Sequence, residues 1–195
     1  MKEVNRVIKF ATKNKGKFDE AVRVTMRYGI ELSQVSLEKY EIQADDLKEI
    51  AAISAQEALR EVGATAILTE DAGLFIDALN GFPGPYSSYV YRTLGVEGIL
   101  KLLDGVDKRA AHFACVVAYC DGSHTTCFEG VVQGNVNLKP TGQQGFGFDP
   151  IFVPDQGDGR TFAELEVDVK NRYSHRALAF SDFCRWVTST SISEK

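Results

Sequence analysis

The chain lacks the features that mark disulfide-rich and zinc-binding proteins. Its four cysteines are Cys115, Cys120, Cys127 and Cys184. They form no CxxC pair, and three of the four fall in runs typical of strands. Free buried thiols in a reducing compartment fit this pattern better than disulfides or zinc ligands. The three histidines are too scattered along the chain to indicate a zinc site.

Long apolar runs and an excess of positive charge are also missing. No apolar stretch is long enough to span a membrane, and no signal peptide is evident, so a cytoplasmic protein without a membrane partner is expected. The formal net charge is −5, which does not favour binding to nucleic acid. Local cations must therefore hold any polyanionic ligand.

The order of apolar segments predicts an α/β fold with a mixed sheet. Strands are expected at 7–10 and 30–35, and amphipathic helices at 17–28 and 47–62. Gly29 and Gly63 are expected to end these two helices. Later in the chain, Asp121-Gly122 indicates a hairpin. The 195 residues, 44% of them hydrophobic, suit one large domain over 1–195 or two small lobes that share a core.

Two adjacent acids lie between two apolar runs in the first half of the sequence. A short apolar run ends at Leu68, Glu70 and Asp71 follow, and a second apolar run begins after Gly73. This pattern predicts two strands with the acids at their junction. Because neighbouring residues on a strand point to opposite faces, the two acids are expected to do different jobs. Taken alone, the stretch fits a polar turn equally well.

A cluster of lysines joins the first strand to the first helix. Backbone N–H groups and the helix dipole favour an anion at such a point. The order of residues differs from a Walker A loop, and a capped helix with solvated lysines is the alternative. The residues that we expect to bind phosphate are Thr12, Lys13, Asn14, Lys15, Gly16 and Lys17.

Two segments near the C-terminus carry further candidate groups. Ser174 is placed to cap a helix from whose first turn His175 and Arg176 would project. In the glycine-rich loop before it, the rings of Phe146 and Phe148 could stack on a planar base, or they could belong to the core. Carboxylates suited to Mg²⁺ are Glu41, Glu70 and Asp71.

Together these segments resemble the inosine triphosphate pyrophosphatase family, which hydrolyses non-canonical purine nucleoside triphosphates. Each motif alone is weak, but five in the same order are specific. They are Thr12-Lys13-Asn14-Lys15-Gly16-Lys17 with Glu20, Glu70-Asp71-Ala72-Gly73-Leu74, Phe82-Pro83-Gly84-Pro85-Tyr86-Ser87-Ser88, Gly145-Phe146-Gly147-Phe148-Asp149-Pro150 and Ser174-His175-Arg176. Two residues depart from the family pattern: Ala72 replaces a serine that contacts substrate, and Phe148 replaces a tyrosine.

The resemblance implies an elongated mixed β-sheet flanked by helices, with an active-site cleft between two lobes. It also implies a homodimeric, Mg²⁺-dependent hydrolase of nucleotide metabolism that cleaves ITP, dITP or XTP to the monophosphate and pyrophosphate. The implied roles are general base and metal ligand for Asp71, metal ligand for Glu41, triphosphate contacts for Lys13, Lys17 and Lys170, and base recognition for Phe146, Gly147, Phe148, Asp149, His175 and Arg176.

Water attack at the α-phosphorus accounts for such a reaction without a covalent intermediate. Pyrophosphate leaves with most of the developing charge, which Mg²⁺ and the lysines would stabilise while Asp71 orients or deprotonates the water. Two other functions fit parts of the sequence: a nucleotide-binding module without catalysis, and a pyrophosphatase of the Maf type. The loop at 146–149 and Ser174-His175-Arg176 favour the purine family over the second.

Overall fold

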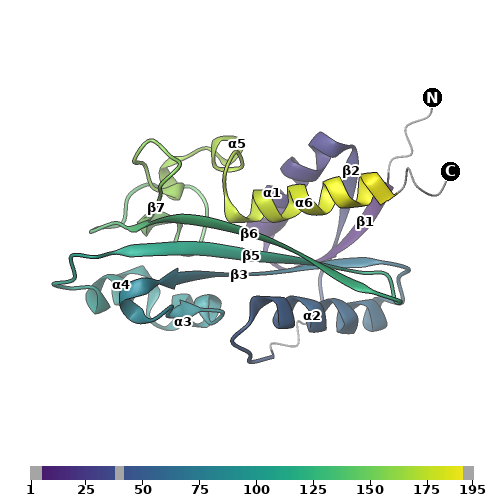
Figure 1. The fold of residues 1–195 in the computed structure, drawn as a ribbon, viewed down its shortest axis with the longest axis horizontal. Coiled ribbons are helices and arrows are strands. Elements are labelled where there is room, and N and C mark those ends of the chain that lie inside the picture. Colours follow the sequence, from purple (N-terminus) through teal and green to yellow (C-terminus); the bar gives the residue numbers. More distant parts are fainter. Residues whose placement is uncertain (1–5, 38–41, 191–195) are drawn as a thin grey trace. The chain divides into compact units, whose positions relative to one another are not determined.

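The computed structural model describes residues 6–37 and 42–190, which form a mixed sheet with helices (Figure 1). In this part of the chain the strands are β1 (Arg6–Ala11), β2 (Ile30–Val35), β3 (Ile67–Ile76), β4 (Pro83–Gly84), β5 (Ala110–Cys120), β6 (Thr125–Val136) and β7 (Phe152–Pro154). Their order in the seven-stranded sheet is β2-β1-β3-β5-β6-β7, and β4 pairs with β3. β1 is parallel to β2 and β3, whereas the β3–β4 and β6–β7 pairs are antiparallel, so the predicted mixed α/β sheet is confirmed.

The helices of the described residues include both amphipathic helices that the sequence predicts. They are α1 (Lys15–Thr25), α2 (Leu47–Val62), α3 (Ser87–Thr93), α4 (Gly95–Leu102), α5 (Val167–Lys170) and α6 (His175–Thr190). Gly29 and Gly63 are the predicted stops after the first two helical segments, and both adopt left-handed backbone conformations with φ of 70° and 58°. Glycine takes this conformation without steric cost, which is why the helices end there.

Two predictions about local structure are wrong. β3 continues without a break through Glu70 and Asp71, so the acids lie within one strand and not at a junction of two. α1 begins at Lys15 and not at the predicted position 17, so Lys15 as well as Lys17 lies in the first helical turn. The apolar pattern could not show that one strand runs through both acids, because it does not reveal that cations neutralise the charge of the buried Glu70.

The chain divides into two compact units, and three of its strands contribute to both. The first unit is Met1–Asp71, Cys115–Gly130 and Arg176–Lys195, and the second is Ala72–Ala114 and Val131–His175. In the first unit the ring of Phe10 on β1 packs against Phe18 of α1 and Phe180 of α6. On the other face, the hydroxyl of Thr69 on β3 donates a hydrogen bond to the carbonyl of Ala51 in α2. Helices therefore cover both faces of this part of the sheet (Figure 1).

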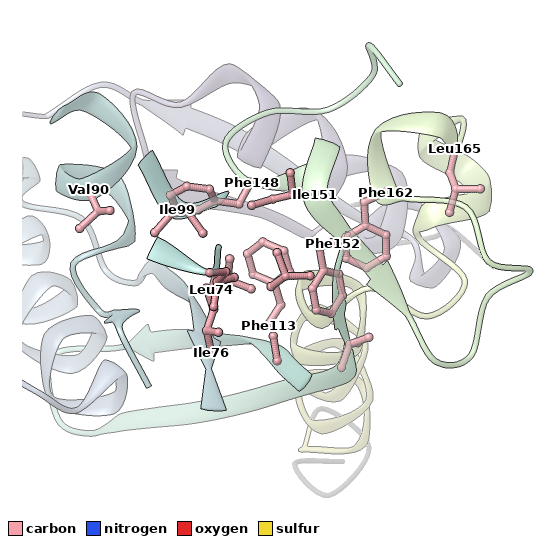
Figure 2. Packing of buried hydrophobic residues seen from close by; sticks show 14 residues of the cluster. Leu74, Ile76, Val90, Ile99, Phe113, Phe148, Ile151, Phe152, Phe162 and Leu165 are labelled. Carbon is pink, nitrogen blue, oxygen red and sulfur yellow. The ribbon is translucent and has the colours of Figure 1, made fainter. Parts of the chain in front are cut away.

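The second unit has its own apolar core, which Figure 2 shows from close by. Phe113 of β5 is central to it: its ring lies 4.8 Å from that of Phe152 on β7 and 6.1 Å from that of Phe162. Leu74 and Ile76 of β3 are also fully buried there. This packing fixes β3 and the segment after β6, which carry several of the predicted site residues.

Candidate functional site

The turn between β1 and α1 is held by its own side chains. The hydroxyl of Thr12 accepts a hydrogen bond from the N–H of Asn14 at 3.1 Å, and the side chain of Asn14 accepts one from the N–H of Lys17 at 3.0 Å. Asn14 is thus the N-cap of α1. Among the neighbouring residues, Lys13 and Lys15 are exposed and Gly16 is half-buried. A helix start with three lysines favours an anion.

The two acids on β3 differ in burial, as their positions on a strand predict. The side chain of Glu70 is 0% exposed, whereas that of Asp71 is 15% exposed. Because an exposed carboxylate can meet a ligand directly, Asp71 is the candidate for chemistry. Glu70 can act only through its protein neighbours.

Glu70 lies at the centre of a buried group of polar side chains, here called the Glu70 network, which comprises Lys17, Glu20, Glu70, Cys115 and Arg176. Oε1 of Glu70 lies 2.9 Å from Nη2 of Arg176, and Oε2 lies 2.8 Å from Nζ of Lys17. Nη1 of Arg176 lies 2.6 Å from Oε2 of Glu20. The thiol of Cys115 donates a hydrogen bond to Oε1 of Glu70 over 3.2 Å. The network therefore ties β3 and β5 to α1 and α6 within the first unit.

These charges fix one another's ionisation. Burial favours the neutral form of Glu70, but Arg176 and Lys17 outweigh it and hold the pKa of that carboxyl well below its usual range. Burial also opposes the charge on Lys17, yet Glu70 and Asp71 raise the pKa of its ammonium. Burial, followed by Glu70, raises the pKa of the Cys115 thiol well above its usual value. The thiol therefore keeps its proton and can donate it in a hydrogen bond.

Lys17 connects the Glu70 network to Asp71. Its ammonium lies 4.0 Å from Oδ1 of Asp71, and its side chain is 19% exposed. The cation is thus held by a buried carboxylate on one side while part of it remains reachable. A positive charge fixed in this way can bind a phosphate oxygen with little further loss of side-chain freedom.

The structure corrects where two predicted side chains point. The sequence predicts that His175 and Arg176 project from the first turn of the last helix, but they are only 3% and 2% exposed. Both terminal nitrogens of Arg176 contact carboxylates, one of them on Glu20, which is 156 residues away in sequence. Glu70, considered as a metal ligand, has both oxygens in contact with cations. Its carboxylate is therefore already used within the protein.

Sequence reasoning left two members of the network out of the site. Glu20 lies three residues after Lys17 on α1, and this spacing places two side chains on one face of a helix. That spacing could have indicated a shared role. Cys115 stands inside an apolar run, and nothing in the sequence distinguishes it from a core residue.

A second charged group lies in the second unit, where Lys170 of α5 meets the glycine-rich loop. Nζ of Lys170 lies 2.6 Å from Oδ2 of Asp149, and both side chains are buried. The same carboxylate oxygen accepts a hydrogen bond from the N–H of Phe146 at 2.9 Å. The ammonium lies 5.3 Å from the ring centre of Phe146 and 5.0 Å from that of Phe162. The pair therefore fixes the shape of the loop.

Some of the other predicted site residues in the second unit lie in the core, and the rest are half-buried. Phe148 is 3% exposed and its ring packs edge-on against Tyr91, so the structure decides for the core at this position. The imidazole of His175 is stacked on the ring of Phe113, with centres 4.6 Å apart. Half-buried positions are those of Ala72, Phe146 and Gly147.

Metal binding rests on few side chains in the described part of the chain. Within residues 6–37 and 42–190, no three His, Cys, Asp or Glu side chains gather as a metal site. Mg²⁺ commonly takes one or two carboxylates and completes its shell with water and substrate phosphate. The partly exposed carboxylate of Asp71 fits that role. Glu41 lies outside the described residues.

Sequence comparison finds relatives along nearly the whole chain. The sequence model of the Ham1 family matches residues 8–186. A dITP/XTP pyrophosphatase from Methanopyrus kandleri is 49% identical over 91% of this chain and 94% of its own length. A dITP/XTP pyrophosphatase from Thermococcus kodakarensis is 47% identical over 91% of this chain and 95% of its own.

Solved structures give the same picture of the fold. A HAM1 protein from Coxiella burnetii superposes with a TM-score of 0.82 at 30% identity, covering 94% of this chain and 99% of that one. The Ham1 protein of Staphylococcus aureus superposes with a TM-score of 0.81 at 26% identity, covering 95% and 100%. The chain thus shares its fold with Ham1 proteins of solved structure.

Proposed function

The chain belongs to the Ham1 family, and we propose that it hydrolyses the non-canonical purine nucleoside triphosphates ITP, dITP and XTP to the monophosphate and pyrophosphate. Relatives with 49% and 47% identity, named dITP/XTP pyrophosphatases, support this substrate class. Such an enzyme is a hydrolase of nucleotide metabolism that removes unwanted purines from the nucleotide pool.

The observation that carries the proposal is the placement of Lys17 between two carboxylates. Glu70 holds its ammonium at 2.8 Å, and the partly exposed Asp71 lies 4.0 Å away. A fixed cation beside an accessible base suits attack by water on a phosphate. The turn before α1 and the start of the helix would bind the rest of the triphosphate through Thr12, Lys13, Asn14, Lys15 and Gly16.

In the proposed mechanism, Asp71 orients a water molecule toward the α-phosphorus and accepts its proton. The P–O bond to the β-phosphate then breaks, and pyrophosphate leaves with the developing negative charge. Lys17 stabilises that charge because its ammonium is already aimed by Glu70. No covalent intermediate is required.

We also propose that the activity depends on a divalent metal, Mg²⁺, bound by Asp71 and Glu41. When bound, the ion would supply further positive charge to the phosphate oxygens. Asp71 fits this role through its partial exposure. The test is the loss of pyrophosphate release after chelation, and its return when Mg²⁺ is added.

Base recognition is assigned by the family resemblance to residues of the second unit and to Arg176. Phe146 offers a half-buried ring, and the carboxylate of Asp149 accepts a hydrogen bond from its backbone N–H. His175 is the other polar residue of this unit that the resemblance assigns to the base, whereas it assigns Lys170 to the triphosphate. Phe148 is in the core, which leaves its backbone and that of Gly147 for contact with the base.

For Lys170, the ion pair with Asp149 favours a role in shaping this loop over direct contact with phosphate. For Arg176, engagement by Glu20 and Glu70 favours a role through those carboxylates over direct contact with the base.

The working protein is proposed to be a cytoplasmic homodimer that has neither nucleic acid nor membrane as a partner. Exposed apolar side chains in and around α3 support self-association, because a dimer would remove them from water: Phe82, Tyr89, Tyr91 and Leu94. No helix among the described residues has the length and apolarity needed to cross a bilayer. Light scattering at several protein concentrations tests the dimer.

A panel of nucleotides with separate detection of phosphate and pyrophosphate tests the activity. We expect pyrophosphate and no phosphate, with ITP, dITP and XTP turned over faster than ATP or GTP. Release of phosphate would contradict the assigned bond. Tight binding without turnover would indicate a nucleotide-binding module, and faster turnover of modified pyrimidine nucleotides would indicate an enzyme of the Maf type.

A further inference from the structure

Cys115 is placed where it can control the Glu70 carboxylate. Its side chain is fully buried on β5, and its sulfur lies 3.2 Å from Oε1 of Glu70. A buried cysteine usually serves as a small apolar residue. This one instead donates its proton to a charged oxygen, and hydrogen bonds to charged groups are stronger than those between neutral groups.

The geometry around Glu70 shows why one more donor matters. The last torsion of a glutamate side chain has a broad energy well, so contacts set the plane of the carboxylate. Cys115 and Arg176 both bind Oε1, the latter at 2.9 Å. With that oxygen held at two points, Oε2 is directed toward Nζ of Lys17 at 2.8 Å.

We propose that Cys115 is a positioning residue, whose thiol orients Glu70 and thereby fixes the ammonium of Lys17 for the phosphate groups of the substrate. Without the thiol, each oxygen of the carboxylate would keep a single contact, Oε1 with Arg176 and Oε2 with Lys17. The cation that binds the substrate would then itself have to orient the carboxylate. The inference deepens the proposed function and rests on it, because it takes Lys17 as a phosphate contact.

Three variants separate the hydrogen bond from simple packing. Cys115→Ala removes the hydrogen-bond donor. Cys115→Ser keeps a donor, although the side chain of serine is shorter than that of cysteine. Cys120→Ala is the matched control, because Cys120 is buried on the same strand but lies outside the Glu70 network. Urea unfolding of each protein first establishes that all are folded under the assay conditions.

The first measurement is the binding of tripolyphosphate, which has no base, by titration calorimetry. We expect Cys115→Ala to weaken binding by about three- to tenfold, the size of one modest hydrogen bond, with Cys115→Ser and Cys120→Ala within about twofold of the wild type. Equal weakening in Cys115→Ala and Cys115→Ser, or no weakening in Cys115→Ala, would overturn the proposal. Absence of binding by the wild type would also overturn it, since Lys17 would then not contact phosphate.

The second measurement is kcat/KM for pyrophosphate release from ITP. It should fall for Cys115→Ala by about the same factor as the tripolyphosphate affinity, and Cys115→Ser should restore it. A wild-type protein that binds tripolyphosphate but releases no pyrophosphate from any nucleotide would disprove the proposed function. The calorimetric comparison would still decide the role of Cys115 in that case.

Discussion

The two units each bury a carboxylate beside a cation, but the surroundings of the charges differ. In the first unit Glu70 is shared by Arg176 and Lys17, and the chain of charges reaches the partly exposed Asp71. In the second unit Lys170 and Asp149 form a pair with Phe146 and Phe162 close to the ammonium.

The difference shows what each arrangement can do. A network that ends at an accessible acid and a partly exposed lysine can act on a charged ligand. A pair packed near aromatic rings, with a loop N–H on the same oxygen, instead determines the course of the backbone. The first arrangement therefore suits phosphate chemistry, and the second suits the shape of a site that reads a base.

The largest effect is expected for Asp71→Asn in the first unit. The change keeps the size of the side chain but removes the charge of the proposed base, so turnover of ITP should fall about 10²–10⁴-fold. The free energy of unfolding should change little, because Asp71 lies at the accessible end of the network. Retention of more than about half the wild-type rate at saturating Mg²⁺ would exclude Asp71 as the base.

Arg176→Ala should disrupt the Glu70 network, because it removes the cation that two of its carboxylates share. Removing one partner from a buried ion pair leaves uncompensated charge, here on Glu20 and Glu70, and costs about 3–5 kcal/mol of stability. Because Glu70 then loses the cation on its other oxygen, it should position Lys17 less well. We therefore expect kcat/KM for ITP to fall at least about tenfold, and that for ATP by a similar factor.

The two substrates decide the role of Arg176. Equal losses of kcat/KM for ITP and ATP would show that Arg176 acts on phosphate binding, through its contact with Glu70. A loss confined to ITP would assign it to the base, as the family resemblance implies, because a guanidinium donates to the C6 oxygen of hypoxanthine but not to the amino group of adenine.

The second unit is tested by a matched pair of glycine variants. Gly145 and Gly147 both have left-handed backbones, with φ of 71° and 62°. A Cβ at Gly145 would clash with Oδ2 of Asp149, whereas one at Gly147 would meet nothing within 4 Å. Both substitutions carry a backbone cost of about 1–3 kcal/mol, but only Gly145→Ala must displace Asp149.

Gly145→Ala should therefore reduce the preference for ITP over ATP by more than Gly147→Ala does. Unfolding free energies of the two variants measure the shared backbone cost, and the kinetic difference then isolates the displacement of Asp149. An equal effect of both variants on the preference would mean that the Lys170–Asp149 pair does not shape base recognition.

The smallest effect concerns thiol reactivity in the first unit. Cys115 and Cys184 are fully buried, and burial raises the pKa of the Cys184 thiol to about 12. Cys127 is only half-buried on β6. Alkylation of the native protein at neutral pH, followed by mass spectrometry, should modify Cys127 first. Faster labelling of Cys115 would show that the Glu70 network opens in solution.

The sequence by itself determined the elements and the order of the motifs. Periodicity located the helices and strands, and glycines such as Gly29 and Gly63 ended the helices, because these effects depend only on neighbours along the chain. It also predicted that Glu70 and Asp71 would differ, since alternation along a strand is a local property.

Only the tertiary structure decided which charges meet. Arg176 reaches Glu20 and Glu70 across 156 and 106 positions, and Cys115 reaches Glu70 across 45. Nothing local marks such pairs, because the energy that makes them comes from burial and ion pairing after the elements have packed. For the same reason the sequence left Phe148 undecided between ligand and core, and packing in the second unit placed it in the core.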